Sequence, residues 1–185
     1  EMIVVAHHTP TPASLVGSST SVLDAEDFSN RITFDPAALF RSLPSLNVSQ
    51  TGPFGGLTEV RLRGSESNHT LVLIDGVEAN DPANGAAFNL ATLSGLSIER
   101  VEVLRGPQCA RYGSEAIGGV IAITTRDGGT DLNAEPSVDL GLESGSHGFH
   151  QGQLNASFQQ PLKSMQWRNQ ISVTRALTNG SQASL

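Results

Sequence analysis

The stretch IERVEVLRGP, residues 98–107, decides the fold of this chain. Its apolar and β-branched residues predict a strand from Ile98 to Leu104, and the pair Gly106-Pro107 ends that strand. A second strand of the same kind is predicted over residues 120–125. A third, over residues 71–74, is closed by the turn pair Asp75-Gly76. Short strands that alternate with turn residues favour a small sheet over a helical bundle.

The sequence upstream of these strands adds two short helices and further strands. The first helix is expected over residues 24–28, where Asp24 is a candidate N-cap and acidic residues occupy the first turn. Asp35-Pro36 is typical of a helix start, because proline fits the first helical position, and Pro44 is expected to end that helix. Further short strands are predicted at Ser21–Leu23 and around Val60 and Leu62, which alternate with Arg61 and Arg63. We therefore expect an α+β domain with a small mixed sheet over residues 20–131, preceded by a flexible leader over residues 1–19.

Composition narrows the class of protein. With 185 residues the chain has room for one domain and an appendage. The net charge is −7 and no basic run occurs, which argues against nucleic acid as a partner. No apolar run approaches the roughly 20 residues of a membrane-spanning helix, so any membrane segment must be a strand.

The segment after residue 131 shows strict alternation. Apolar residues recur at every second position of three stretches within residues 137–174, with polar residues between them. Strands of about ten residues with this pattern are typical of a transmembrane barrel, and equally of a soluble antiparallel sheet with one wet face. On the barrel interpretation, four apolar residues face lipid, namely Leu140, Leu154, Trp167 and Ile171. Four polar residues then face the lumen, namely Glu143, Gln153, Arg168 and Gln170.

Several motifs together resemble the plug domain of TonB-dependent outer-membrane transporters. They occur in that family's order over residues 20–126, and among its members they look most like the cobalamin transporter branch. The motifs are Leu43-Pro44-Ser45-Leu46, Arg61-Leu62-Arg63-Gly64, Leu73-Ile74-Asp75-Gly76-Val77, Ile98–Pro107, Tyr112-Gly113-Ser114 and Ala116–Ile121.

The resemblance implies a fold, a location and a function. The plug of this family lies inside a 22-stranded barrel, so residues 132–185 would be its first strands, an incomplete set. The protein would reside in the outer membrane of a Gram-negative bacterium. It would bind a scarce substrate, cobalamin or a ferric siderophore, and gate its uptake into the periplasm. The alternative is a plug fragment, or a subunit of a split receptor whose barrel is completed by a partner chain. In that case the chain would act as a module that binds TonB or the partner chain, or as a regulatory module.

Three groups of site residues follow from the resemblance. Residues 1–6 resemble the Ton box, so Met2, Ile3, Val4 and Val5 would pair with TonB as an added strand; the alternative is an ordinary edge strand of the plug. Arg63 and Arg105 match the arginines that pair with barrel glutamates and lock the plug; the alternative is pairing with Glu99 or Glu102. Two polar, glycine-rich loops, residues 51–58 and 79–89, match the apical loops of the plug. With the neighbouring Gln50 they would offer six substrate-facing residues, although such residues often only cap turns. These six are Gln50, Phe54, Asn80, Asp81, Asn84 and Asn89.

No constellation predicts catalysis, a cofactor or a metal. His147 and His150 lie three residues apart, which in a strand places them on opposite faces, and His7-His8 lies in the predicted leader. Cys109 is the single cysteine and is expected to pack as a small apolar residue. The chain is therefore not expected to be an enzyme.

Overall fold

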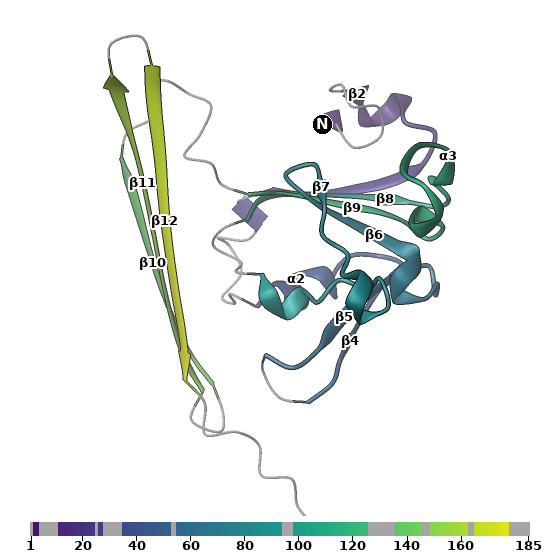
Figure 1. Cartoon of the computed structure of the whole chain (residues 1–185), viewed down its shortest axis with the longest axis horizontal. Coiled ribbons are helices and arrows are strands. Elements are labelled where there is room, and N and C mark those ends of the chain that lie inside the picture. The colour runs from purple at the N-terminus through teal and green to yellow at the C-terminus, as the bar shows by residue number, and fades with distance from the viewer. Residues whose placement is uncertain are drawn as a thin grey trace, which may run out of the picture.

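The computed structural model describes residues 2–3, 11–24, 26–27, 35–52, 55–93, 98–125, 136–145, 149–162 and 165–177. These residues form a plug unit around a five-stranded sheet and a separate three-stranded sheet beside it (Figure 1). In chain order the elements are β1 (Met2–Ile3), β2 (Thr11–Pro12), η1 (Ala13–Leu15), β3 (Ser19–Asp24), α2 (Pro36–Phe40), β4 (Leu46–Gln50), β5 (Thr58–Leu62), η2 (Ser67–His69), β6 (Thr70–Ile74), β7 (Val77–Glu78), η3 (Pro82–Asn84), η4 (Leu90–Thr92), β8 (Ile98–Arg105), α3 (Cys109–Tyr112), η6 (Ser114–Ala116), β9 (Gly119–Thr125), β10 (Ser137–Ser144), β11 (His150–Leu162) and β12 (Met165–Leu177).

The five-stranded sheet is mixed, as the sequence predicts. Its order is β3-β8-β9-β6-β7, and β6 runs parallel to β9 while the other neighbours are antiparallel. The motif stretch that decides the fold forms β8, whose last five residues, Val101–Arg105, are all buried. A separate antiparallel pair, β4 and β5, completes the plug's strands.

One face of this sheet carries the main core. Figure 1 shows α2, β4 and β5 on this side, and Leu39, Phe40 and Leu62 are fully buried there. The second predicted helix forms at the expected residue, because Asp35 Oδ1 accepts a hydrogen bond from the Ala37 amide at 2.9 Å. It ends at Phe40, before the predicted Pro44, and the chain continues in single turns.

The opposite face carries a smaller cluster. Leu71, Leu104, Ala116 and Val120 form it, and residues of the leader pack against it, Ala13 and Val16 among them. Two apolar side chains of the predicted leader thus bury surface against the sheet. The flexibility of the leader stays a prediction.

The motif glycines answer a steric need. A Cβ at Gly119 would clash with the Leu104 carbonyl oxygen of β8, so this glycine allows the close approach of β9 and β8. A Cβ at Gly118 would instead clash with the Ser65 side chain and lie 3.1 Å from the His69 carbonyl oxygen.

A tight turn closes the sheet at β6 and β7. Asp75 and Gly76 have φ values of 50° and 82°, as a type I′ hairpin turn requires. Asp75 Oδ1 accepts from the Thr125 amide at 2.8 Å, and Oδ2 accepts from Thr125 Oγ1 at 2.6 Å. Since Thr125 is the last residue of β9, this turn holds the end of that strand.

The three-stranded sheet confirms the predicted alternation. The order is β10-β11-β12, all antiparallel, and Leu140 is paired with Leu154, which is paired with Val173. Leu140 is 70% exposed and Gln153 only 2%. The side chains of Trp167 and Arg168 lie outside the described residues. β11 extends through Pro161-Leu162.

No helix within the described ranges combines the length and hydropathy needed to cross a bilayer.

Candidate functional site

Arg63 lies directly after β5 in a left-handed conformation. Its φ is 52°, and its amide donates to the Ser45 carbonyl at 2.8 Å, which fixes the turn. The guanidinium lies over Gly106, since a Cβ at that glycine would be 3.2 Å from Arg63 Nη1. Gly106 has a φ of +100°, so both its conformation and its neighbour favour glycine.

Arg105 ends β8 and is only 4% exposed. Its Nε donates to the Pro44 carbonyl and its Nη2 to Ser21 Oγ, each at 2.9 Å. Neither Glu99 nor Glu102, the alternative partners named above, forms an ion pair with Arg105 among the described residues; Glu102 forms one with Arg100 at 2.9 Å. No carboxylate among the described residues forms an ion pair with either Arg63 or Arg105.

The two arginines lie close enough to affect each other. Burial lowers the pKa of Arg105, and the charge of Arg63 lowers it further. A guanidinium remains protonated at physiological pH, so the plug holds two neighbouring cations, of which Arg63 is exposed and Arg105 is buried. Such a pair favours carboxylate partners, which would have to come from outside the described plug residues.

The two apical loops are joined by Asn89. Its Oδ1 accepts from the Thr58 amide at 2.9 Å and from the Ala91 amide at 3.1 Å, across 31 residues of sequence in the first case. Gln50 is exposed, and its Oε1 accepts from Arg41 Nη2 at 3.1 Å. Phe54 lies outside the described residues.

Within the second loop the structure separates three residues predicted together. Asn80 is 7% exposed, and its side chain bonds to the Val72 amide and to the Thr70 and Ala86 carbonyls at 2.8–3.1 Å. The side chain thus holds the loop onto β6 and has no surface left for substrate. Asp81 and Asn84 are exposed on the same loop. Substrate contact is therefore kept for these two and withdrawn for Asn80.

The N-terminal segment forms a short pairing of its own. Met2 and Ile3 pair antiparallel with Thr11–Pro12, in a two-stranded unit outside the plug sheet. The prediction for Val4 and Val5 lies outside the described residues.

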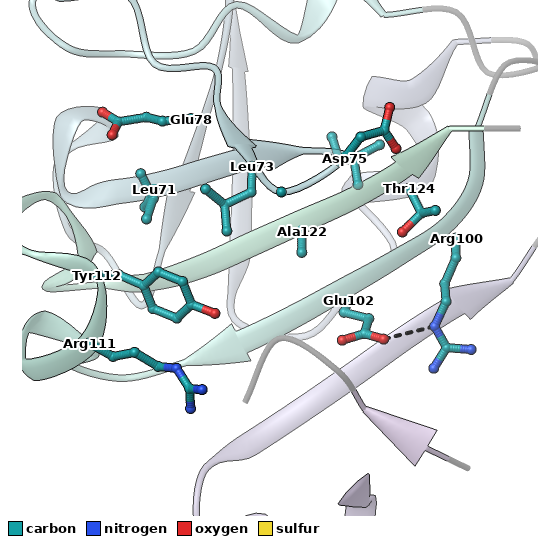
Figure 2. Close-up of a pocket in the computed structure, with 12 residues that line it drawn as sticks. Leu71, Leu73, Asp75, Glu78, Arg100, Glu102, Arg111, Tyr112, Ala122 and Thr124 are labelled. Atoms are coloured by element: carbon teal, nitrogen blue, oxygen red, sulfur yellow. Dashed lines mark hydrogen bonds and ion pairs between the residues drawn. The ribbon is translucent and has the colours of Figure 1, made fainter. Parts of the chain in front are cut away.

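A pocket that the sequence did not predict opens on the second face of the sheet. Its volume is about 810 Å³, with Leu71, Leu73 and Ala122 along its floor. Figure 2 shows Tyr112 at one end, with Asp75 and Arg100 at the other. Burial raises the pKa of Tyr112. The sequence does contain one indication of this pocket. Charged and apolar residues alternate along β8, and this alternation places the charged Arg100 and Glu102 on the face where the pocket opens. No cluster of three or more metal-ligating side chains is found in the described part of the chain.

The comparison with protein families identifies this plug unit. The family model described as the TonB-dependent receptor plug domain matches residues 12–120. The chain belongs to this family. Receptors with this plug domain are transporters and not enzymes, and membership places the protein in the outer membrane.

Solved structures of siderophore receptors have a similar fold. A variant of the ferric enterobactin receptor of Pseudomonas aeruginosa, in complex with enterobactin, matches with a TM-score of 0.65 and 24% identity over 85% of this chain and 24% of that one. The siderophore receptor PirA from Pseudomonas aeruginosa gives 0.62 and 26% over 86% and 29%. The ferric yersiniabactin uptake receptor FyuA from Yersinia pestis gives 0.60 and 25% over 82% and 23%. This chain thus spans about a quarter of their length. The expected cobalamin branch gains no support from these matches.

Proposed function

We propose that this chain supplies the gating plug and first barrel strands of a TonB-dependent transporter that takes up a ferric siderophore. The proposal rests on the order of two parts of the chain. Residues 12–120 match the plug-domain family model, and they are followed by a sheet whose open face carries apolar side chains, including Leu140, which is 70% exposed. The names of the similar structures favour a siderophore over cobalamin. TonB and a small-molecule substrate are the partners this function requires.

The plug would act in three places. Five predicted residues would meet the substrate from above: the exposed Gln50, Asp81 and Asn84, together with Asn89 and Phe54. The arginine pair, Arg63 and Arg105, would hold the plug against glutamates of a complete 22-stranded barrel. From below, residues 2–5 would pair with TonB and transmit its pull.

The N-terminal step is tested by a proline substitution. Val4→Pro removes one backbone donor from the segment, so uptake of a radiolabelled ferric siderophore should fall to background while binding at the cell surface is retained. Val4→Thr keeps both the amide and the β-branched shape and should transport normally. Unchanged uptake in Val4→Pro would sink the proposed TonB contact.

Substrate class and lock are tested separately. Cells carrying the gene, with any sequence it encodes beyond residue 185, should bind ferric catecholate or related siderophores and not cobalamin. Asn84→Ala should weaken that binding. A preference for cobalamin over the siderophore would contradict the siderophore assignment.

The lock is tested by Arg105→Ala, which leaves the proposed carboxylate partners of Arg105 without a cation, at a cost of about 3–5 kcal/mol. Leakage of large antibiotics through the barrel should then rise, and an unchanged barrier would refute the lock.

A further inference from the structure

The first strand of the plug sheet is also its edge. β3 has a single neighbour in the sheet, β8, and the two pair antiparallel from Ser19 opposite Arg105 to Asp24 opposite Arg100. The chain therefore enters the sheet at the end of β3 that lies beside Arg105. Only one of the six β3 residues, Leu23, is buried in the core.

A side-chain bond links this edge strand to the arginine pair. Ser21 Oγ accepts from Arg105 Nη2 at 2.9 Å across 84 residues of sequence. Because Ser21 and Leu23 are two residues apart, they share the face of β3 that meets the main core. The second bond of Arg105, to the Pro44 carbonyl, comes from a different part of the plug. Its guanidinium is thus held between an edge strand and the core.

We infer that Ser21 is a positioning residue for Arg105, and that detaching β3 from β8 releases this guanidinium and disrupts the arginine pair. The inference rests on the proposed function only in naming the source of the pull, the N-terminal segment. The geometry of the Ser21–Arg105 contact is independent of it.

The order of events follows from the register. An edge strand drawn from its N-terminal end loses its pairs one after another, beginning with Ser19 opposite Arg105. A contact just before this point, from Gln108 Nε2 to Ser18 Oγ at 3.2 Å, would be lost earlier. Ser21 comes next, before Leu23 leaves the core. Arg105 therefore loses its bond to the edge strand while the rest of the sheet is still intact, and only its bond to the Pro44 carbonyl remains.

The contact itself is tested by NMR on the isotope-labelled protein in detergent micelles. The probe is the signal of the Arg105 Nη2 protons, which donate to Ser21 Oγ, identified by its absence in Arg105→Lys. Ser21→Ala removes the acceptor, so exchange of these protons with solvent should be about tenfold faster, the effect expected for loss of a bond to a charged group. Ser21→Thr keeps the hydroxyl and should restore slow exchange.

A matched control lies on the same strand and face. Ser19 is exposed, and its side chain forms no hydrogen bond with another described residue. Ser19→Ala should therefore leave the Arg105 signal unchanged. Equal exchange in Ser21→Ala and the unsubstituted protein would overturn the inference. So would an effect of Ser19→Ala as large as that of Ser21→Ala, because general loosening of the strand would then explain both.

A disulfide tests whether β3 must detach. Thr20→Cys and Leu104→Cys are direct partners in the ladder, and a Cys109→Ser background prevents other pairings. The oxidised form should take up substrate at least about tenfold more slowly at unchanged binding, and reductant should restore uptake. Equal uptake in both redox states overturns the detachment step. The Val4→Pro result, which needs no Ser21 contact, decides the proposed function independently.

Discussion

Strand β5 of the plug and the three-stranded sheet share an alternating pattern with opposite polarity. In β5, Val60 and Leu62 are 1% and 0% exposed, and the charged Glu59 and Arg61 lie on the outer side. In β10–β12 the leucines lie outside, with Leu142 78% exposed, and Gln151 and Asn155 are 5% and 4% exposed. The same two-residue period therefore buries the apolar side chains in the plug and the polar side chains in β10–β12.

This difference shows which surroundings each sheet is built for. A sheet whose apolar face is open loses the hydrophobic contribution that stabilises a soluble domain, unless that face meets lipid or another apolar surface. The plug closes its core with α2, β4 and β5 (Figure 1). The second sheet has no such cover among the described residues, in keeping with the membrane side of a barrel.

The largest contrast is expected from matched leucine truncations. Leu62 is 0% exposed in the plug and Leu140 is 70% exposed in β10. Leu62→Ala should destabilise the plug by about 2–5 kcal/mol, because it leaves a cavity, whereas Leu140→Ala should cost under about 1 kcal/mol in detergent. Hydrogen exchange of the β6 and β9 amides measures the change. Similar effects of both variants would erase the distinction between the two sheets.

Charge insertion in β11 sharpens the polarity of the second sheet. Leu154→Arg places a charge on the apolar face at a cost of about 2–4 kcal/mol near the bilayer centre, while Gln153→Arg places it on the polar face. Heat-modifiable mobility of the protein in outer-membrane fractions reports assembly. We expect Leu154→Arg to assemble poorly and Gln153→Arg nearly normally. Equal tolerance would mean that these strands do not face lipid.

A smaller effect separates structural from exposed asparagines in the plug. Asn80→Ala removes the partner of the Val72 amide and should cost about 1–3 kcal/mol, because that buried group loses its acceptor. Asn84→Ala, on the exposed part of the same loop, should leave the thermal midpoint within error and lower substrate affinity instead. A drop in affinity for Asn80→Ala without loss of stability would restore Asn80 to the substrate site.

The smallest effect concerns acid dependence. The hydrogen bond that protonated Glu115 donates to Glu78 raises the pKa of Glu115, and burial and the charge of Glu78 raise it further. Because the folded pKa is raised, the stability from this pair is present below the ordinary glutamate pKa and is lost as pH rises through the raised value. Glu115→Gln should therefore stabilise the plug at neutral pH, by under about 1 kcal/mol, and not in acid. Urea unfolding at both pH values tests this, with the exposed Glu66→Gln as control; a gain in acid alone would contradict the sign.

Local pattern predicted the elements of both sheets. The motif stretch became β8, the Asp75-Gly76 turn formed as expected, and the helix began at Pro36 because Asp35 caps it. These features depend on neighbours in sequence, which periodicity and turn chemistry record.

Contacts across long sequence distances could not be predicted in the same way. Nothing near Ser21 signals a bond to Arg105, and an asparagine in a polar loop looks alike whether it is exposed, as Asn84 is, or buried, as Asn80 is. The leader was predicted to be flexible from its prolines, yet Val16 packs on the sheet because an apolar cluster is already there. Tertiary packing decides such cases.

The two hydrogen bonds between Asp75 and Thr125, called the clamp below, also indicate where plug sequences could be exchanged between receptors. Both carboxylate oxygens of Asp75 are used by the residue at which the chain leaves the plug sheet. A plug transferred between receptors with its junction just after Thr125 would carry both halves of the clamp with it. A junction a few residues earlier would separate them and leave the carboxylate without its partner. Recombinant receptors should accordingly accept changes of length after this point more readily than changes just before it.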